Sequence, residues 1–366
     1  MQTQYLMIGY IHENAAALNR TLESNEASVR ELAEWARSRS IERIILTGIG
    51  SSWTAIVAAR LAYEKLVDIP TVALPSTELL YYGQELVNER TLPIVVSRSG
   101  ERGYVVSALQ HMAGLGAETV AMTGVADSLL AQEADRALIT GEGPEITYPK
   151  TKSVISCMGL LIRLALELSS RPADDKNKLL EELKKCPHYI EKTIAQAEPA
   201  VKALMDEVKG LDKMVIAGTG ANIGAVEEGA LKIQETAFLT TRAQDTGNLL
   251  HGYLCDFRQG WLITLLVSDK DLQLSKDALR VVKALGARTL CITGPDLDLG
   301  GLADYQIALP VRVNMIFEPL LFLPPLQLMT YYWTVTKGLN PDAPSTMRTV
   351  LDAILPPGRE EPEFRK

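Results

Sequence analysis

Short apolar runs rich in β-branched residues alternate with longer amphipathic stretches along most of the chain. This alternation is typical of strand-helix-strand units, which build parallel sheets. One set of predicted elements comprises strands at 44–46, 93–96 and 119–122 and helices at 54–67 and 103–115. A second set comprises strands at 214–217, 262–267 and 289–292 and helices at 223–239 and 274–285. The pattern predicts two open parallel sheets with helices on their faces.

The two sets are copies of one unit. IERIILTGIGSS begins at Ile41 and LDKMVIAGTGAN at Leu211, while LGAETVAMTG begins at Leu115 and LGARTLCITG at Leu285. Both pairs are separated by the same 170 residues, from 41 to 211 and from 115 to 285. A constant offset at two separate places indicates an internal duplication.

The predicted organisation is an α/β chain of two tandem units joined by a connector. Residues 26–38 are expected to form an amphipathic helix, and residues 172–197, rich in Lys, Glu and Leu, a charged one. Within the apolar stretch 316–333 we expect a buried turn and then a helix that opens near Pro324. The expected divisions are an N-terminal segment at 1–34, a first unit at 35–171, a helical connector at 172–204, a second unit at 205–340, and a tail near the active site at 341–366.

Composition and charge exclude several classes of partner. With 45 acidic against 37 basic residues the formal net charge is -8, which argues against nucleic acid and anionic membranes as partners. The four cysteines lack CxxC spacing, so neither a zinc site nor a disulfide framework is indicated. No secretory signal is evident, and prolines interrupt the most apolar stretch, so no membrane span and a cytoplasmic location are predicted.

Two loops of the first unit carry hydroxyl side chains where a parallel sheet binds ligands. Such ligands lie beyond the carboxyl ends of the strands, where backbone amides at helix N-termini favour anions. Gly48 and Gly50 permit a sharp turn after the first strand, and Ser51 and Ser52 follow at the start of a helix. SRSGERG at 97–103 adds further hydroxyls and amides suited to a phosphate. Taken singly, each loop is equally compatible with a plain turn whose serines cap a helix.

The second unit keeps the glycine turn but loses most of the hydroxyl donors. GTGAN stands in place of GIGSS, and VSDK in place of SRSG. A requirement of the fold would preserve these residues in both copies, whereas a phosphate site built in one copy explains their loss from the other. The chain has no GxGxxG loop and no phosphate loop of the GxxxxGK type, so neither a nicotinamide cofactor nor ATP is indicated and no cofactor is expected.

As a set, these motifs resemble the sugar isomerase (SIS) domain family, in the tandem form found in the isomerase half of glucosamine-6-phosphate synthase. The similarity covers nearly the whole chain. Its segments are GIGSSW at 48–53, SRSGE at 97–101, EITYPKTKS at 145–153, EEGALKIQE at 227–235, LLHG at 249–252 and PPLQLMTYYWTVTKGLNPDAP at 324–344. The resemblance implies two tandem SIS domains, each a three-layer αβα, flavodoxin-like sheet.

The resemblance also implies a role for each matching residue. The expected phosphate-binding residues are Ser52, Ser97, Arg98, Ser99 and Arg102. Those expected to line the sugar are Gly50, Ser51, Tyr148, Lys150, Thr151 and Arg348. Glu235 matches the proton-shuttling glutamate of the synthase, and His251 matches the histidine that helps to open the sugar ring. That histidine comes from the neighbouring subunit in the synthase, so a homodimer that donates His251 across its interface is implied.

The chemistry of these two residues is reasonable in its own right. Moving a proton between C1 and C2 of a phosphosugar needs one carboxylate that takes and returns it. Ring opening needs a proton relay near neutral pH, which suits histidine. Without the resemblance, Glu235 is expected on a solvated helix face, where Glu228 and Lys232 stand at i, i+4 spacing, and His251 is expected to bond to backbone in a loop.

Departures from the synthase narrow the reaction. The chain begins at the isomerase half, so we expect no release of ammonia from glutamine and no glucosamine-6-phosphate synthesis from it. Where the synthase tail supplies a Schiff-base lysine, Arg348 or Thr349 stands here, and an arginine forms imines poorly. Arg102 replaces a small hydroxyl residue of the synthase loop and is expected to reinforce the phosphate grip or to meet a substrate carboxylate.

The retained glutamate and histidine, without an ammonia source or a tail lysine, favour a deglycase. Such an enzyme splits a sugar-amine 6-phosphate, for example glucoselysine or fructoselysine 6-phosphate, into hexose 6-phosphate and amino acid. An amino-sugar phosphate isomerase or deaminase would need the same residues and is the alternative reaction. The alternative of another class is a sensor that binds phosphosugar without catalysis, although the residues before Ile41 do not suggest the DNA-binding domain that such regulators usually carry.

Overall fold

The computed structural model describes residues 5–101, 103–347 and 349 and contains two parallel five-stranded sheets. The strands of the first unit are β1 (Arg43–Gly48), β2 (Thr71–Pro75), β3 (Thr91–Val96), β4 (Val120–Thr123) and β5 (Arg136–Ile139). Those of the second unit are β6 (Lys213–Gly218), β7 (Thr240–Asp245), β8 (Trp261–Val267), β9 (Arg288–Thr293) and β10 (Tyr305–Ala308). The sheet orders are β2-β1-β3-β4-β5 and β10-β9-β8-β6-β7, so the two units share one topology. The predicted α/β class and tandem three-layer architecture are confirmed.

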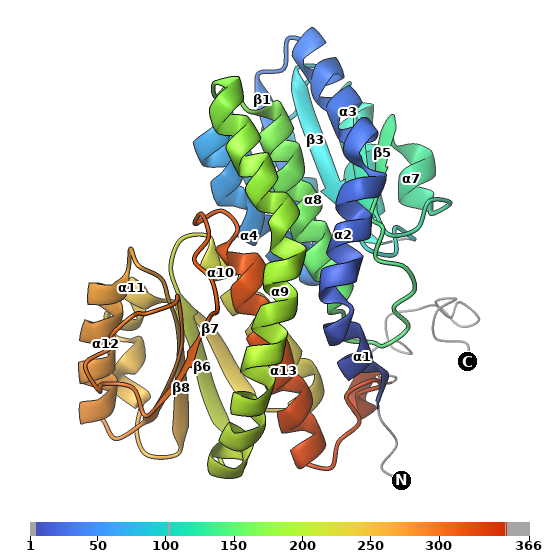
Figure 1. Ribbon diagram of the computed structural model, residues 1–366. Helices are drawn as coiled ribbons and strands as arrows, with labels where there is room; N and C mark the ends of the chain where they lie inside the picture. The colour runs from blue at the N-terminus through green and yellow to red at the C-terminus, as the bar shows by residue number, and fades with distance from the viewer. Residues whose placement is uncertain (1–4, 102, 348, 350–366) are drawn as a thin grey trace.

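Helices cover both faces of each sheet (Figure 1). Those up to the end of the first unit are α1 (Leu6–His12), α2 (Asn14–Ser24), α3 (Glu26–Ser38), α4 (Ser51–Leu66), α5 (Ser76–Tyr82), η1 (Gln84–Leu86), α6 (Tyr104–Gly114), α7 (Leu129–Glu133) and α8 (Lys152–Leu168). The remainder are α9 (Ala173–Val208), α10 (Asn222–Ala237), α11 (Thr246–Leu249), η2 (Tyr253–Asp256), α12 (Leu272–Ala284) and α13 (Glu318–Thr336).

The predicted strands and helices are present, with bounds shifted by a few residues. The helix expected at 26–38 is α3, and the charged connector is α9, which continues past 197 to Val208. Sequence analysis missed β2, β5, β7 and β10, and each of these strands lies at the edge of its sheet. Edge strands are partly exposed, as the residues of β2 are throughout, and β5, β7 and β10 contain charged or polar residues that interrupt the apolar run typical of a central strand.

Alternating side chains of the central strands point to different cores. In β1, Ile44 faces an inner core, whereas Ile45 belongs to a separate cluster under α5, α6 and α7. In β6, Met214 joins the same inner core, and Val215 packs under α11 and α12. The inner faces of both sheets therefore share one hydrophobic core with α4, α8, α9, α10 and α13. Figure 1 shows α9 running along this core from one unit to the other.

Helix α13 begins earlier than predicted. The expected start near Pro324 is wrong, because α13 already begins at Glu318 and contains Pro324 and Pro325 in its interior. Pro319 lies in its first turn, where proline is well tolerated. An interior proline costs about 3 kcal/mol or more, and burial of almost every side chain of α13 offsets this cost.

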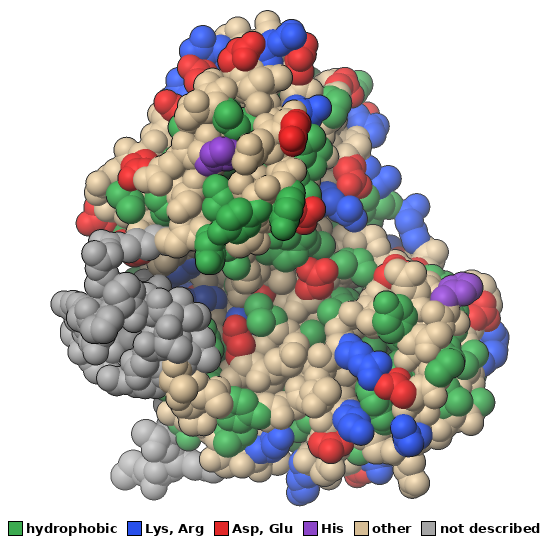
Figure 2. Space-filling model, turned by 180° about the vertical axis from the view of Figure 1, so that it is seen from behind, with side chains coloured by type: hydrophobic (Ala, Val, Ile, Leu, Met, Phe, Trp, Pro, Cys, Tyr) green, Lys and Arg blue, Asp and Glu red, His purple; other side chains and the backbone are tan. Residues whose placement is uncertain are grey.

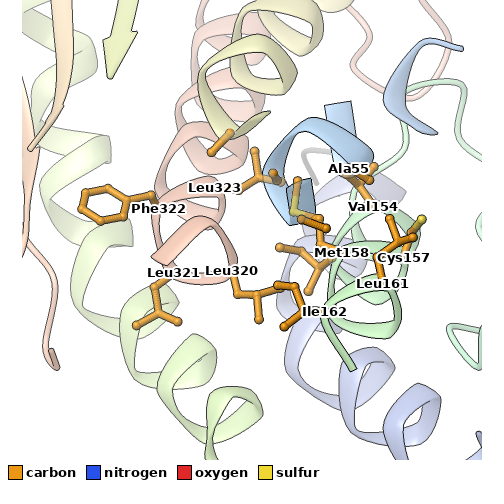
Figure 3. Packing of buried hydrophobic residues seen from close by; sticks show 14 of the residues in the cluster. Ala55, Val154, Cys157, Met158, Leu161, Ile162, Leu320, Leu321, Phe322 and Leu323 are labelled. Atoms are coloured by element: carbon orange, nitrogen blue, oxygen red, sulfur yellow. The ribbon is translucent and has the colours of Figure 1, made fainter. Parts of the chain in front are cut away.

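The packing of α13 shows how this burial is achieved (Figure 3). Leu320 and Leu323 point toward Met158 and Ile162 of α8, while Phe322 points to the opposite side. All five side chains are almost fully buried. A helix that is apolar around its whole circumference belongs in the interior of a protein. Within the described part of the chain, no helix has the length and apolar character to cross a bilayer.

Helices α4 and α10 join the two units by a close antiparallel contact. A Cβ placed on Gly224 of α10 would lie 2.3 Å from the backbone nitrogen of Ala58 and 2.5 Å from the carbonyl oxygen of Thr54. One turn further along α10, Glu228 contacts Ser51 and Thr54. Because higher numbers on α10 meet lower numbers on α4, the C-terminal half of α10 extends past the N-terminus of α4. This direction places its later residues above the carboxyl edge of the first sheet.

Replacing Gly224 by alanine should destabilise the protein, because the new methyl group forces α4 and α10 apart. Overpacking of this kind typically costs about 1–3 kcal/mol, which a lower urea midpoint in equilibrium unfolding would reveal. Gly9→Ala on α1 is the matched control, since no atom lies within 4 Å of its added Cβ. The control should leave stability unchanged or raise it by about 0.5–1 kcal/mol. Equal midpoints for Gly224→Ala and the unmodified protein would show that the helices need no such close approach.

Candidate functional site

A pocket lies at the switch point of the first sheet. The chain leaves β1 toward β2 on one side and returns to β3 on the other, which is where doubly wound sheets bind ligands. The pocket encloses about 330 Å³ between its lining atoms, including space that opens to solvent. Its polar lining residues are Ser51, Ser52, Arg98, Thr123, Thr140, Lys150 and Ser153. Figure 2 shows a hollow between the two units, with charged side chains on its walls.

The structure brings the two predicted donor loops together. Ser52 at the start of α4 and Arg98 after β3 line the same pocket. Ser97 does not line it, and its hydroxyl oxygen instead accepts a hydrogen bond from the Gly100 amide at 3.2 Å. Ser99 lies half-buried on the same loop. Arg102, predicted to bind phosphate, lies outside the described residues.

The loop 145–151 forms one wall of the pocket and is held by a buried carboxylate. Glu145 accepts hydrogen bonds from the hydroxyls of Thr151 and Ser153 at 2.6 Å each and from three backbone amides at the start of α8. The carboxylate thereby caps the helix N-terminus. Lys150 lines the pocket, and its ammonium donates to the carbonyl oxygens of Glu145 and Thr147 at 2.9 Å each.

The other sugar-lining candidates occupy different positions around this wall. Thr151 is fully buried and does not line the pocket, and its hydroxyl donates to Glu145 at 2.6 Å. Tyr148 is half-buried, and its amide donates to the carbonyl oxygen of Asp342 at 2.9 Å, which brings the segment after α13 against this loop. Gly50 is the exposed residue before α4. Arg348 lies outside the described residues.

Helix α10 carries a buried cluster of three charged groups. The ammonium of Lys232 lies 3.4 Å from Glu228 and 2.6 Å from Glu235. Glu228 and Lys232 are almost completely buried, whereas the Glu235 side chain keeps 17% of its surface exposed. The expectation that these residues lie on a solvated helix face is therefore wrong. Burial raises the pKa of Glu228, and the positive charge of Lys232 opposes that shift.

Hydrogen bonds tie this cluster to the first unit. The hydroxyl of Ser51 donates to Glu228 at 3.1 Å, and that of Thr54 donates at 2.6 Å. Glu235 lies seven residues further along α10, which corresponds to about 10 Å along a helix. Given the antiparallel course of α10, Glu235 lies beyond the N-terminus of α4, although it is not among the residues that line the pocket. The partly exposed carboxylate thus lies at the outer end of the cluster.

His251 lies apart from this arrangement within the single chain. It follows α11 and is exposed. It lines a separate hollow with Arg242, Tyr253 and Asp256, beside the ion pair that Arg242 forms with Asp256. The structure of one chain does not bring His251 to the pocket of Ser52 and Arg98.

The equivalent switch point of the second unit is filled by a carboxylate of the chain itself. Asp271 precedes α12 and accepts hydrogen bonds from the Ser268 amide at 2.7 Å and from the Thr219 hydroxyl. Nearby, Asn222, at the position of Ser52 in the repeat, donates to Glu318 at 2.9 Å. A carboxylate at this helix N-terminus uses the donors that an anion would need. The unit whose turn has lost its serine hydroxyls is thus the one in which a carboxylate of the chain itself, Asp271, lies at the switch point.

Sequence reasoning gave no part in the site to Glu142, Glu228 and Lys232, which do not line the pocket but contact Arg98, Ser51 and Glu228 respectively. The last two belong to the motif EEGALKIQE, but an i, i+4 pair has the same spacing on a buried and on a solvated face. Glu142 is buried beside Arg98, with an ion-pair distance of 3.8 Å to the guanidinium nitrogen Nε. No sequence pattern marks that pair. Among the described residues, no group of three or more His, Cys, Asp or Glu side chains is placed to hold a metal ion.

Comparisons with known proteins show what the chain is similar to. A family model described as SIS domain matches residues 39–167 and 210–337. The glutamine–fructose-6-phosphate aminotransferase (isomerizing) of Caldanaerobacter subterraneus subsp. tengcongensis is 29% identical over 356 residues, which are 94% of this chain and 58% of that protein. The chain therefore spans less than two thirds of the length of this relative.

Solved structures show the same fold. The C-terminal domain of glucosamine-fructose-6-phosphate aminotransferase from Francisella tularensis matches with a TM-score of 0.84 at 22% identity, covering 94% of this chain and 99% of that one. The tagatose-6-phosphate ketose/aldose isomerase of Escherichia coli matches with a TM-score of 0.76 at 20% identity, covering 94% and 96%. At 20% and 22% identity, these matches show that the fold is shared.

The acidic switch point of the second unit predicts a pH-dependent stability. Burial raises the pKa of Glu318 to about 7, and the negative charges of Asp271 and Asp269 add to the shift. A glutamate in the unfolded chain titrates near about 4.3. The pKa of Glu318 is higher in the folded than in the unfolded protein. The protonated carboxyl therefore contributes its full share of the folding stability below the unfolded pKa, and this share is lost as the pH rises to about 7.

Glu318→Gln stays neutral and should therefore exceed the unmodified protein in unfolding free energy at pH 8 by up to about 3 kcal/mol, with no difference near pH 4. Urea unfolding across this pH range measures the difference. Glu23→Gln on α2 is the exposed control and should change stability by less than about 0.5 kcal/mol throughout. If the unfolding free energy of Glu318→Gln exceeded that of the unmodified protein by the same amount at every pH, the ionisation of Glu318 would not be the cause.

Proposed function

Because the chain belongs to the SIS domain family, we propose that it is a phosphosugar deglycase, which cleaves a sugar-amine 6-phosphate such as glucoselysine or fructoselysine 6-phosphate. The related proteins named above are sugar-phosphate aminotransferases and isomerases, whose substrates undergo proton transfer between neighbouring carbons. A deglycase applies the same step to an adduct of a sugar phosphate and an amine, and then adds water.

The hydrogen bond between Ser51 and Glu228 carries the proposal. It joins the loop suited to phosphate, in the first unit, to the helix with the acid-base residues, in the second. Glu235 then lies about two helical turns from Ser51, beyond the N-terminus of α4. A substrate held by its phosphate at Ser52, Arg98 and the loop of Ser97 and Ser99 would extend its other end toward this carboxylate.

The chemistry follows from one carboxylate and one water. Glu235 removes the proton from the carbon that bears the nitrogen while the carbonyl oxygen takes up a proton from water, which leaves an enaminol. Glu235 then returns its proton to the former carbonyl carbon, and the nitrogen loses its own proton to water. The product is an imine. Water adds to the imine carbon, the carbon-nitrogen bond breaks, and the amine departs with a proton as the sugar carbonyl forms. The ammonium of Lys232 lies 2.6 Å from Glu235 and holds its side chain in position for the first step.

We assign ring opening to His251 of a second copy of the chain. The exposed position of His251, outside the pocket of its own chain, fits donation across a homodimer interface. In such a dimer each active site would combine a phosphate loop and Glu235 from one subunit with an imidazole from the other. Mixing an inactive Glu235→Gln chain with an inactive His251→Gln chain should then restore part of the turnover, because some sites in mixed dimers are complete.

The proposed reaction is tested by incubating the protein with fructoselysine 6-phosphate, glucoselysine 6-phosphate and glucosamine 6-phosphate. Free lysine together with hexose phosphate is the expected result. Release of ammonia from glucosamine 6-phosphate alone would instead identify a deaminase, and tight binding without turnover of any of the three a sensor.

Glu235→Gln should lower kcat by about 100-fold or more while binding of the substrate stays within about threefold. The reason is that the amide keeps the shape of the side chain but cannot accept and return a proton. Glu227→Gln is the matched control on the same helix, where it lines a separate hollow with Arg60 and Asp245, and should retain turnover. Near-normal turnover of Glu235→Gln would remove this residue from the mechanism.

The double variant Ser97→Ala with Ser99→Ala should weaken binding of a sugar 6-phosphate by at least about tenfold, because hydrogen bonds to a charged group are lost. Binding of the unphosphorylated sugar should change little, and calorimetric titration of both ligands measures the contrast. Ser107→Ala, exposed on α6, is the control. Equal weakening for both ligands would place the phosphate elsewhere.

A further inference from the structure

A buried carboxylate lies directly behind the wall of the first pocket. Glu142 follows β5 and is 1% exposed, and within the described residues neither of its carboxylate oxygens accepts a hydrogen bond of good geometry. Among the described residues, Arg98 is the cation paired with it, and Nε of Arg98 lies 3.8 Å from Oε1 of Glu142. Arg98 lines the pocket and keeps 17% of its side chain exposed. The ion pair thus joins Glu142, which is buried from solvent, to Arg98, which a ligand in the pocket can contact.

The backbone next to Glu142 is shaped around its carboxylate. A Cβ placed on Gly124 would lie 2.3 Å from Oε1 of Glu142, so a larger residue there would displace the carboxylate. The amide of Gly124 donates to the carbonyl oxygen of Arg98 at 3.0 Å, and the hydroxyl of Thr123 donates to the same oxygen at 3.2 Å. The loops after β3, β4 and β5 therefore fix Arg98 and Glu142 relative to one another.

We propose that Glu142 is the counter-charge of Arg98 in the empty site and takes up a proton when an anionic ligand engages Arg98. This inference rests on the proposed function, since it takes the ligand to be a sugar phosphate. Glu142 acts through Arg98 and is a positioning residue. It makes the grip on phosphate depend on pH through a group that the ligand does not touch.

Electrostatics gives the sign of this coupling. Burial raises the pKa of Glu142 above its ordinary value, and the nearby Thr140 hydroxyl, the backbone amide of Glu142 itself and the guanidinium of Arg98 oppose the shift. A phosphate at Arg98 adds negative charge beside the carboxylate and offsets the guanidinium, so the pKa of Glu142 rises further and a proton binds. Ligand binding must then weaken as the pH rises, by at most tenfold per pH unit for one proton.

The other charged groups around Glu142 do not substitute for Arg98. Glu145 is negative and pushes the pKa of Glu142 in the same direction as burial. Arg20 donates to the backbone carbonyl oxygen of Glu142 at 2.9 Å rather than to its carboxylate. Lys150 also lines the pocket and donates to carbonyl oxygens of its own loop. The buried thiol of Cys157 stays neutral, because burial raises its pKa.

The test is calorimetric titration of fructose 6-phosphate into the unmodified protein and into Glu142→Gln, each in two buffers of different ionisation enthalpy between pH 5 and 8. Protons released by the phosphate itself are common to both proteins, so the difference in proton uptake reports Glu142. We expect the unmodified protein to take up more protons, by up to one per site. Its affinity relative to Glu142→Gln should fall as the pH rises.

Two further variants keep the test decisive. Arg98→Gln removes the guanidinium, so the carboxyl of Glu142 should already be protonated in the empty site, and the extra uptake should vanish as binding weakens. Glu118→Gln, an exposed partner of Arg39, should bind and take up protons like the unmodified protein. If Glu142→Gln does not fold, the comparison with Arg98→Gln supplies the same difference.

Equal proton uptake by the unmodified protein and the two pocket variants, with binding intact, would overturn the inference and leave the proposed function standing. Failure of the unmodified protein to bind any of the sugar 6-phosphates would instead overturn the proposed function. The two failures are therefore distinguishable in one series of titrations.

Discussion

The antiparallel contact of α4 and α10 is the constraint on which the site depends. A glycine at position 224 lets the two helix backbones approach closely, and the direction of the crossing decides which residues meet. Because α10 runs past the start of α4, its charged residues lie over the carboxyl edge of a sheet to which they do not belong. The hydroxyls that open α4 then bond to Glu228 and fix the register of the two helices. Together with the shared inner core, this contact fixes α10 relative to the loop that opens α4.

Burying Lys232 between two carboxylates is costly unless each charge keeps partners, because desolvation of an ion costs several kcal/mol. The cluster meets this condition unevenly. Glu228 has two hydroxyl donors and the ammonium, whereas Glu235 has the ammonium and partial contact with solvent. The inner carboxylate is thereby immobilised and the outer one stays accessible. In the second unit, by contrast, the carboxylate of Asp271 accepts hydrogen bonds from the Ser268 amide and the Thr219 hydroxyl at the carboxyl edge of its own sheet.

Much of the fold could be predicted from the sequence because each central strand appears twice, in the same order and at a constant offset. The edge strands escaped because one side of each lacks a neighbouring strand and tolerates polar residues, as in β5. The start of α13 was misplaced because local proline rules were applied to a helix whose stability comes from packing. The sequence predicted that Ser52 and Arg98 lie together at the carboxyl edge of the first sheet. It did not predict the pairing of Arg98 with Glu142, since that pair joins residues from two different loops and has no local signature. The burial of Lys232 likewise depends on the neighbouring unit and cannot be read from α10 alone.

The shared inner core has a consequence for how the two copies have diverged. One face of each sheet packs into a common hydrophobic core, so neither copy has a polar, solvent-compatible surface on that side. A single copy released from the other would expose a broad apolar area of the sort that drives aggregation. The second copy can therefore lose the serine hydroxyls of its turn, while its sheet and helices remain necessary to cover the inner face of the first copy. It serves as structural support for the first copy whatever residues its own loops carry.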